Sequence, residues 1–257
     1  MTAKDSRGLL CVTAHPDDET LFTGALLAML AERGIATHIV CATPGEDGAL
    51  GEPPICSREE LGQVREEELR CAAAALGVRS VRVLGYLNPD YVIGSPNLTA
   101  FQAEAAEFEG RIHEAMSRLR PRVVVTHGSQ GEYGHPGHVK VHEAVLQVHA
   151  RLRAAVGAVP ALYSFSAKAD GWEQPNLNQR DQADLLLQVA PWIEQKTAAI
   201  ACHRTQRELF FKTFPQARSM RDITLVHGHA EGFHRIWTPR GFDELAFFGD
   251  EMRDLNS

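Results

Sequence analysis

The stretch at residues 14–19, Ala-His-Pro-Asp-Asp-Glu, constrains the fold of this chain more than any other. It follows an apolar run at residues 9–14, which predicts a buried strand. It precedes residues 20–31, whose apolar positions recur at helical spacing. The stretch is therefore predicted to be a strand-to-helix turn. In an open α/β sheet, such a turn lies at the carboxyl ends of the strands, where ligands bind.

The side chains of this turn suit a divalent cation. A phosphate-binding turn usually carries glycines, and three carboxylates would repel a phosphate. His15 and Asp18 offer one nitrogen and one oxygen ligand, and Pro16 stiffens the turn between them. The alternative is that Asp17 or Asp18 simply caps the following helix. A histidine and two aspartates within four residues favour the metal.

Strand and helix signals alternate along the rest of the chain. Strands are predicted at residues 9–14, 35–42, 80–84, 123–126 and 161–165. Helices are predicted at residues 20–31, 57–76, 100–119, 136–156 and 184–202. The alternation predicts an α/β fold, a three-layer sandwich with a mostly parallel central sheet. We expect a single domain over residues 1–257, with a core at about 8–206 and a less regular C-terminal extension at 207–257.

The turns after the first four strands of such a sheet lie along one edge. That edge brings the stretch 14–19 near residues 45–47, 88–90 and 127–138. The last of these segments holds His135 and His138, which are three residues apart at a helix start and share a face. A helix N-terminus disfavours imidazolium, and a metal ligand has to be neutral, so His138 is well placed to bind a metal.

His15, Asp18 and His138 would supply three ligands to one zinc ion per chain. Three ligands leave a fourth position open, which is typical of a catalytic rather than a structural zinc site. The alternative is that His135 caps the helix and that His138 and His142 are surface histidines, because H-x-x-H alone is a weak signal.

The composition argues against several classes of protein. The net charge is −7, from 26 basic and 33 acidic residues, which argues against nucleic-acid binding. No apolar run has the length needed to span a membrane, and the first residues lack the apolar region of a signal peptide. The cysteines are odd in number and form no C-x-x-C pair, which predicts reduced thiols and a cytoplasmic location. They are Cys11, Cys41, Cys56, Cys71 and Cys202.

Ala-His-Pro-Asp-Asp-Glu at residues 14–19 and Tyr-Gly-His-Pro-x-His at residues 133–138 resemble the motifs of the PIG-L/LmbE-like family of zinc-dependent N-deacetylases. Weaker similarity extends to residues 45–46, 65–69 and 201–206. The resemblance implies a Rossmann-like fold and a hydrolase that removes acetyl groups from the amide nitrogen of N-acetylglucosamine-type sugars. It also implies a small-molecule N-acyl sugar as the substrate and a homo-oligomer as the assembly.

The resemblance further implies a role for each residue that matches a motif. The metal ligands would be His15, Asp18 and His138. The catalytic residues would be Asp17, as general base, and His135, which in its protonated form would stabilise the oxyanion or protonate the leaving amine. The substrate-binding residues would be Glu46, Arg65, Asn88 and Tyr133.

Two positions depart from the family pattern. Gly137 stands where an Asp or Asn is common, which removes a hydrogen-bond partner near the metal and is expected to loosen His138. Asn88 stands where many members have an Asp after a Leu-Gly pair, which affects the expected substrate more than the chemistry.

Other functions fit parts of this pattern. A metal-dependent amidase on a non-sugar or thiol-conjugate amide would use the same residues. A phosphoesterase would usually need a second metal about 4 Å away, and the sequence offers ligands for only one. A non-catalytic zinc-binding scaffold would not need Asp17 or His135. A dinucleotide site lacks its G-x-G-x-x-G. The loop at residues 85–99, with Tyr86 and Tyr91, is either a lid over the sugar or an ordinary connection.

Overall fold

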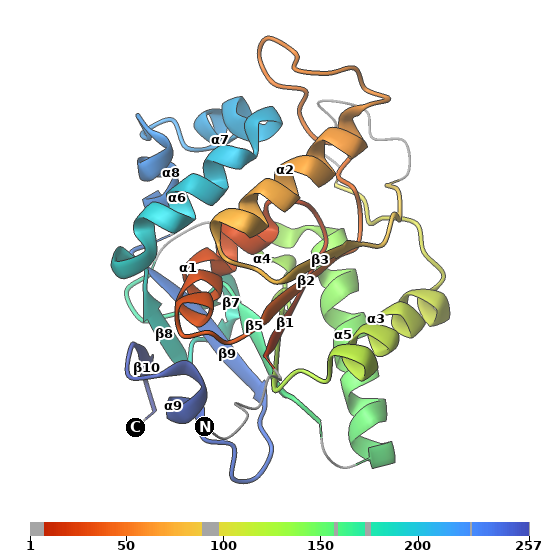
Figure 1. Ribbon diagram of the computed structural model, residues 1–257, viewed down its shortest axis with the longest axis vertical. Coiled ribbons are helices and arrows are strands. Elements are labelled where there is room, and N and C mark those ends of the chain that lie inside the picture. The colour runs from red at the N-terminus through yellow and green to blue at the C-terminus, as the bar shows by residue number, and fades with distance from the viewer. Residues whose placement is uncertain (1–7, 89–97, 157–158, 173–175, 227, 257) are drawn as a thin grey trace.

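The computed structural model describes residues 8–88, 98–156, 159–172, 176–226 and 228–256. Its main sheet has eight strands in the order β10-β8-β9-β5-β4-β1-β2-β3 (Figure 1). Their bounds are β1 Leu9–Thr13, β2 Thr37–Cys41, β3 Ser80–Val83, β4 Val123–Thr126, β5 Ala161–Phe165, β8 Leu185–Gln188, β9 Ala230–Trp237 and β10 Met252–Asp254. A two-stranded sheet pairs β6 (Ala167–Lys168) with β7 (Asn178–Gln182).

Helices cover both faces of the main sheet (Figure 1). They are α1 Asp18–Glu32, α2 Leu61–Ala75, α3 Ala105–Leu119, α4 Gly131–Gly134, α5 Pro136–Val156, α6 Ile193–Cys202, α7 Arg207–Thr213, α8 Met220–Val226 and α9 Glu244–Phe248, with 3-10 turns at Ala190–Trp192 and Arg204–Gln206. α6 packs on α1 and α2, and α3 packs on α5. Within the described ranges, no helix is long and apolar enough to cross a membrane.

The central strand β1 shows why the sheet has a helix layer on each side. All five of its residues are buried. Leu9 and Cys11 pack into the core that contains α1 and α2, whereas Leu10 and Val12 pack into the core that contains α3 and α5. Successive side chains of a strand point to opposite faces, so a strand that is apolar at every position needs cover on both. The predicted three-layer α/β sandwich is confirmed.

The order of the strands places a topological switch point between β1 and β4. β1 pairs in parallel with β2 on one side, where Leu9 faces Thr37, and with β4 on the other, where Val12 faces Thr126. The chain leaves β1 toward β2 and reaches β4 only after β3 and α3. The turns that follow β1 and β4 therefore diverge at the carboxyl edge and open a crevice between them, where ligands bind in folds of this kind.

The C-terminal extension is more regular than the sequence predicts. It supplies β9, which lies between β5 and β8 and pairs antiparallel with both. The helix predicted at residues 184–202 begins instead as the strand β8, and only its second half is the helix α6. Leu185 and Leu187 are buried at alternate positions there, so pairing with β9 overrides their helical preference.

A buried ion pair between Glu231 of β9 and Lys196 of α6 holds α1 in place. The Glu231 carboxylate accepts hydrogen bonds from the Ala25 and Leu26 backbone amides at 2.8 and 2.9 Å. It also accepts one from Lys196 Nζ at 2.7 Å, and Lys196 in turn donates to the Leu21 carbonyl oxygen at 2.9 Å. Because α1 begins at Asp18, these bonds connect the C-terminal strand with the helix that follows the turn at residues 14–17.

Other element boundaries agree with the sequence to within a few residues. β4 and β5 have the predicted bounds, as does α5, which was expected to end at about Val156. α2 begins at Leu61 rather than residue 57, although the Ser57 amide does donate to the Glu60 carboxylate at 3.0 Å, as one half of the predicted capping box. α3 begins at Ala105 rather than residue 100. Of the loop at 85–99, residues 89–97 lie outside the described ranges, and Tyr91 is among them.

The expectation that all five cysteines are reduced is wrong. Cys71 on α2 and Cys202 at the end of α6 form a disulfide, whereas Cys11, Cys41 and Cys56 are free. The two bonded residues are 131 positions apart in the chain, so no local spacing pattern reveals the pair. They meet because α2 and α6 pack against each other.

Phe233 tests whether the C-terminal segment belongs to the core. This residue of β9 is 2 % exposed and lies between Phe165 of β5 and Leu185 of β8. Phe233→Ala should lower the free energy of unfolding in urea by about 3–5 kcal/mol, because it leaves a cavity in the sheet core. Leu245→Ala, at a position 58 % exposed, should change it by less than about 0.5 kcal/mol. Equal effects would contradict a core role for β9.

Candidate metal centre and active-site cavity

The turn between β1 and α1 holds its carboxylates in a strained backbone. Asp17 has a φ of 110°, in the left-handed region that an aspartate adopts only at a cost. The His15 amide donates to Asp18 Oδ2 at 2.8 Å, which fixes that carboxylate over the turn. The Asp17 side chain makes no hydrogen bond that caps α1, so the capping alternative is wrong for Asp17. Strain of this kind is typical of functional sites.

The segment after β4 brings the second histidine group to the same edge. Gly131, Glu132 and Gly134 have φ values of 63°, 60° and 86°, so the chain turns sharply before α5. Pro136 is the first residue of α5, the helical position that suits its fixed φ and missing N–H. His138 follows in the first turn and is fully buried.

Three residues from these two segments meet in a triangle, with both oxygens of the Asp18 carboxylate near a histidine nitrogen. His15 Nδ1 lies 3.2 Å from His138 Nε2 and 3.6 Å from Asp18 Oδ2. His138 Nε2 lies 3.4 Å from Asp18 Oδ1. Ligands at about 2.1 Å from a tetrahedral zinc ion lie about 3.4 Å apart, so this set fits zinc. His15 and Asp18 also line a cavity, so a metal ion held by this set would be close to a ligand bound there.

The protonation states of the set suit a metal ligand. Burial lowers the pKa of His138, which keeps its imidazole neutral. Burial alone would raise the pKa of Asp18, but His138 and His127 beside it hold that pKa well below its usual range. The structure thus brings together the three residues predicted as metal ligands, with the charges that a divalent cation requires.

His127 lies close to the predicted metal ligands, but both of its ring nitrogens already have partners. Its Nε2 is 3.3 Å from Asp18 Oδ2, and its ring stacks on that of His138 with centroids 4.0 Å apart. Asp18, His127 and His138 therefore form another set of metal-binding type among the described residues, as do His15, His135 and His138. The Ala14 amide, however, donates to His127 Nε2 at 3.0 Å and occupies its lone pair. Each of these two sets shares two members with His15, Asp18 and His138, so neither offers a separate site.

Arg65 holds the predicted general base. Its Nη2 lies 2.9 Å from Asp17 Oδ2, and its guanidinium also donates to the carbonyl oxygens of Pro16 and Gly45. Arg65 is 4 % exposed, so it does not belong to the solvated helix face that residues 65–68 alone would suggest. Burial raises the pKa of Asp17 to about 7, against the lowering effect of Arg65. A carboxylate with a pKa near neutral pH suits general base catalysis.

His135 is neutral, and the expectation of a protonated His135 is wrong. Burial, together with the neighbouring His15 and His138, lowers its pKa to about 2. The Gly137 amide donates to His135 Nδ1 at 3.0 Å, so the ring hydrogen lies on Nε2. A neutral imidazole can still donate a hydrogen bond to an oxyanion through Nε2–H.

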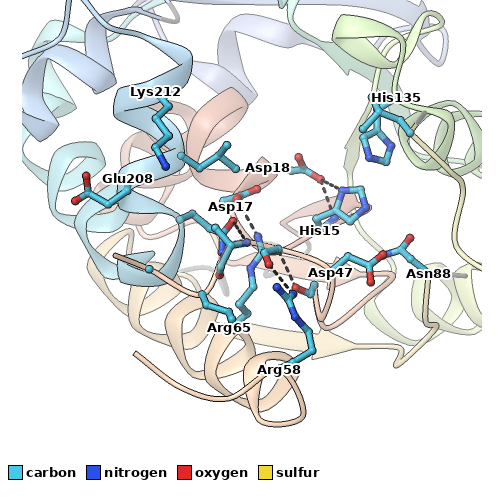
Figure 2. Close-up of a pocket in the computed structure, with 18 of the residues that line it drawn as sticks. His15, Asp17, Asp18, Asp47, Arg58, Arg65, Asn88, His135, Glu208 and Lys212 are labelled. Carbon is cyan, nitrogen blue, oxygen red and sulfur yellow. Dashed lines mark hydrogen bonds and ion pairs between the residues drawn. The ribbon is translucent and has the colours of Figure 1, made fainter. Parts of the chain in front are cut away.

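The cavity beside these residues has a volume of about 620 Å³. One end is polar, and the outer wall contains both apolar and charged side chains (Figure 2). Figure 2 shows Glu208 and Lys212 on the side away from His135 and Asn88. The polar end is lined by His15, Asp17, Asp18, Asp47, Arg65, Asn88 and His135. The outer wall includes Leu50, Glu52, Pro54, Leu98, Leu209 and Lys212.

The predicted substrate-binding residues differ in how they meet this cavity. Asn88 and Arg65 line it, and so does Tyr133, which is 50 % exposed and packs edge-on against His135 at 5.8 Å. Glu46 is not among the lining residues, because its Oε1 accepts the Asn88 amide at 2.7 Å. Its neighbour Asp47 lines the cavity instead. Adjacent residues of the turn point in different directions, and the sequence does not reveal which one faces the ligand.

Residues of the motif at 201–206 make hydrogen bonds and ion pairs that stabilise the elements around the cavity. Thr205 donates through its amide and its hydroxyl to Glu68 of α2, at 2.8 and 2.7 Å. Gln206 bonds both the amide and the carbonyl of Ala49 in the cavity wall. His203 is buried, with its Nε2 3.4 Å from Glu19 Oε1, and Glu19 Oε2 accepts the Asp17 amide at 3.1 Å. His203 is therefore linked through Glu19 to the turn that carries Asp17.

Sequence reasoning missed Glu132. Its carboxylate accepts hydrogen bonds from the Nδ1 atoms of His138 and His127, at 2.6 and 2.9 Å. His138 is therefore held although Gly137 has no side chain, and the expected loosening is wrong. A Cβ at position 137 would meet the His135 ring, at 3.1 Å from Nδ1. The sequence contains one signal that could have identified this residue, namely a carboxylate six residues before a predicted metal ligand.

The fold and the relatives of this chain are those of a metal-dependent deacetylase. Residues 10–149 match the family model of PIG-L, the GlcNAc-PI de-N-acetylase, and the chain belongs to this family. It is 32% identical over 238 residues to a Mycolicibacterium smegmatis protein named 1D-myo-inositol 2-acetamido-2-deoxy-alpha-D-glucopyranoside deacetylase, with 80% of this chain and 82% of that protein covered. A protein of the same name from Mycobacterium sp. (strain KMS) is 34% identical over 229 residues, with 77% and 73% covered.

Solved structures share the fold at lower identity. The N,N'-diacetylchitobiose deacetylase of Pyrococcus horikoshii has a TM-score of 0.64 and 21% identity, with 92% of this chain and 85% of that chain covered. The 4-carboxy-2-hydroxymuconate hydratase of Pseudomonas putida has a TM-score of 0.65 and 21% identity, with 92% and 99% covered. One fold thus serves two reactions, so the reaction has to be argued from the site.

Removing His138 should abolish metal binding. We expect the unaltered protein to retain about one zinc ion per chain after dialysis, and His138→Ala to retain almost none, because two ligands hold zinc poorly. Elemental analysis of the dialysed proteins measures this. His113→Ala, at an exposed position of α3, is the control and should keep its zinc. Equal zinc contents in both variants would show that the metal binds elsewhere.

Proposed function

We propose that this protein is a zinc-dependent hydrolase that removes the acetyl group from the amide nitrogen of an N-acetylglucosamine-type substrate. The observation that carries the proposal is the triangle of His15, Asp18 and His138, with the Asp17 carboxylate beside it in the same cavity. A bound zinc ion supplies Lewis acidity, which polarises the amide carbonyl and makes a water molecule more acidic.

The chain's own residues move the protons and stabilise the charge. Asp17 takes a proton from the attacking water, and Arg65 holds its carboxylate in place for that step. His135 faces the same cavity and donates its Nε2–H to the oxyanion of the tetrahedral intermediate. Because His135 is neutral, the proton that the leaving amine needs comes from Asp17, which has just accepted one.

The cavity wall suggests how the rest of the substrate binds. Asp47 and Asn88 are suited to hydrogen-bond sugar hydroxyls, and Tyr133 offers an exposed aromatic face beside the metal. Arg65 already donates to Pro16, Asp17 and Gly45. We therefore expect it to position Asp17 and the loop at Gly45 in addition to contacting the sugar. The group attached to the sugar would lie against the outer wall.

Specific observations weigh against the other functions. A scaffold protein does not need a strained Asp17 that is held by a buried arginine. A phosphoesterase with two metals needs a second ligand set, and His127 is occupied by the Ala14 amide. An amidase acting on a non-sugar amide would use the same residues, and a comparison of substrates has to distinguish it. A homo-oligomer, a single domain and a cytoplasmic location stay predictions.

Amine release tests the proposed reaction. Zinc-loaded protein should release primary amine from at least one N-acetylglucosaminyl compound, because the site is built to hydrolyse an acetamide. An amine-reactive fluorophore measures the product from N-acetylglucosamine, diacetylchitobiose, the N-acetylglucosaminyl inositol named for the relatives, and a non-sugar acetamide. Release from the non-sugar amide alone would favour the amidase, and release from none, with zinc bound, would contradict the proposal.

Asp17→Asn separates catalysis from metal binding. The amide keeps the size of the side chain but cannot take a proton, so kcat should fall by about 100-fold or more while the zinc content stays unchanged. The rate is measured by amine release and the metal by elemental analysis. A variant with near-normal kcat would show that Asp17 is not the base.

A further inference from the structure

Glu132 combines burial, strain and a full set of hydrogen-bond donors. Its side chain has no exposed surface, so it cannot touch a substrate. Its φ of 60° and ψ of −83° are close to those of the rare and strained γ-turn, which a glycine would adopt more easily. The contacts of a side chain at such a position have to compensate for the energetic cost of the strained backbone.

Two of those contacts are made to imidazole rings at or beside the proposed metal site. Glu132 Oε2 accepts from His138 Nδ1 at 2.6 Å and from His127 Nδ1 at 2.9 Å. The other oxygen, Oε1, accepts from the Gly128 amide at 2.9 Å and from Asn178 Nδ2 at 3.0 Å. All four neighbours donate, so a carboxylate, which only accepts, is the one side-chain group that satisfies them together.

The bond to His138 determines which ring nitrogen faces the metal. With its hydrogen on Nδ1 and directed at Glu132, His138 presents the Nε2 lone pair to His15 and Asp18. A carboxylate behind a metal-binding histidine fixes the orientation of the ring and makes the ligand more basic.

The bond to His127 extends the same control to the other segment. With its Nδ1 hydrogen directed at Glu132, His127 accepts the Ala14 amide at Nε2. Ala14 directly precedes His15, so Glu132 fixes the backbone at one histidine ligand through His127 and the ring of the other directly. The turns after β1 and β4 are thereby joined across the crevice.

We propose that Glu132 is the positioning residue that holds both histidine ligands of the metal site, directly for His138 and through His127 for His15. It does so in a chain whose residue 137 is a glycine and offers no side chain for the purpose. The proposal rests on the proposed zinc site, and it concerns the affinity and geometry of that site rather than the substrate.

Zinc affinity of Glu132→Gln tests the proposal. The amide has nearly the same shape but carries two donors, so it cannot accept from all four neighbours. Zinc affinity, measured by competition with a chromophoric chelator, should fall by about 10- to 100-fold. The absorption spectrum of the cobalt-substituted variant should also change, because it reports ligand geometry.

Asp181→Asn is the matched control. Asp181 is a buried carboxylate that accepts hydrogen bonds from Ser129 and Ser164 and has no described contact with a histidine ring. Its variant should lose stability and keep the zinc affinity and the cobalt spectrum of the unaltered protein. Circular dichroism checks that each variant is folded.

The outcomes separate the proposal from the zinc site itself. Unchanged affinity in Glu132→Gln, or an equal loss in Asp181→Asn, would overturn the positioning role. Failure of the unaltered protein to bind zinc would overturn the metal site and this proposal with it. If Glu132→Gln does not fold, Glu132→Asp replaces it, because aspartate tolerates a positive φ better and its shorter carboxylate cannot reach both histidines. Zinc affinity equal to that of the unaltered protein would then overturn the role.

Discussion

The parallel pairing of β1 with β4 is the constraint on which the site depends. β1 and β4 are neighbours in the sheet although α1, β2, α2, β3 and α3 separate them in the chain. Their register, with Val12 opposite Thr126, ends both strands at the same level. The turn that carries His15 and the segment that carries His138 therefore meet at one edge, where atoms of the three candidate ligands lie within 3.6 Å of one another.

A buried polar network makes that meeting stable. Charged groups away from water are costly unless each has a partner, and here the carboxylates and imidazoles satisfy one another. Glu132 bonds His138 and His127, and Arg65 bonds Asp17. The strained φ values of Asp17 and Glu132 lie within this network, which compensates for them through hydrogen bonds. The strain is thus the consequence of directing carboxylates inward from tight turns.

Residues that are distant in the sequence also stabilise the edge of the sheet where the site lies. Glu231 on β9 and Lys196 on α6 bond the backbone of α1, and Gln206 bonds the cavity wall at Ala49. The disulfide joins α2, which carries Arg65, to the end of α6. The C-terminal half therefore contributes to the site mainly by fixing elements that the N-terminal half supplies, and this explains why it contains few residues with an obvious chemical role.

The sequence by itself determined the fold class and predicted three candidate metal ligands, because a buried strand, a turn and a helix start are local signals. His15, Asp17, Asp18, His135 and His138 all stand at such boundaries, and the family motifs coincide with them. Only the tertiary structure decided which groups hold these residues. Glu132 is directed at the histidines by a strained backbone, and Arg65 donates to Asp17. Asp47, rather than Glu46, lines the cavity, and β9 lies between β5 and β8 in the main sheet. The contacts of Arg65, Glu46 and β9 are made to residues far apart in the chain, and local periodicity carries no information about them. Glu132 reaches histidines five and six positions away, but only through a sharp turn that periodicity does not reveal either.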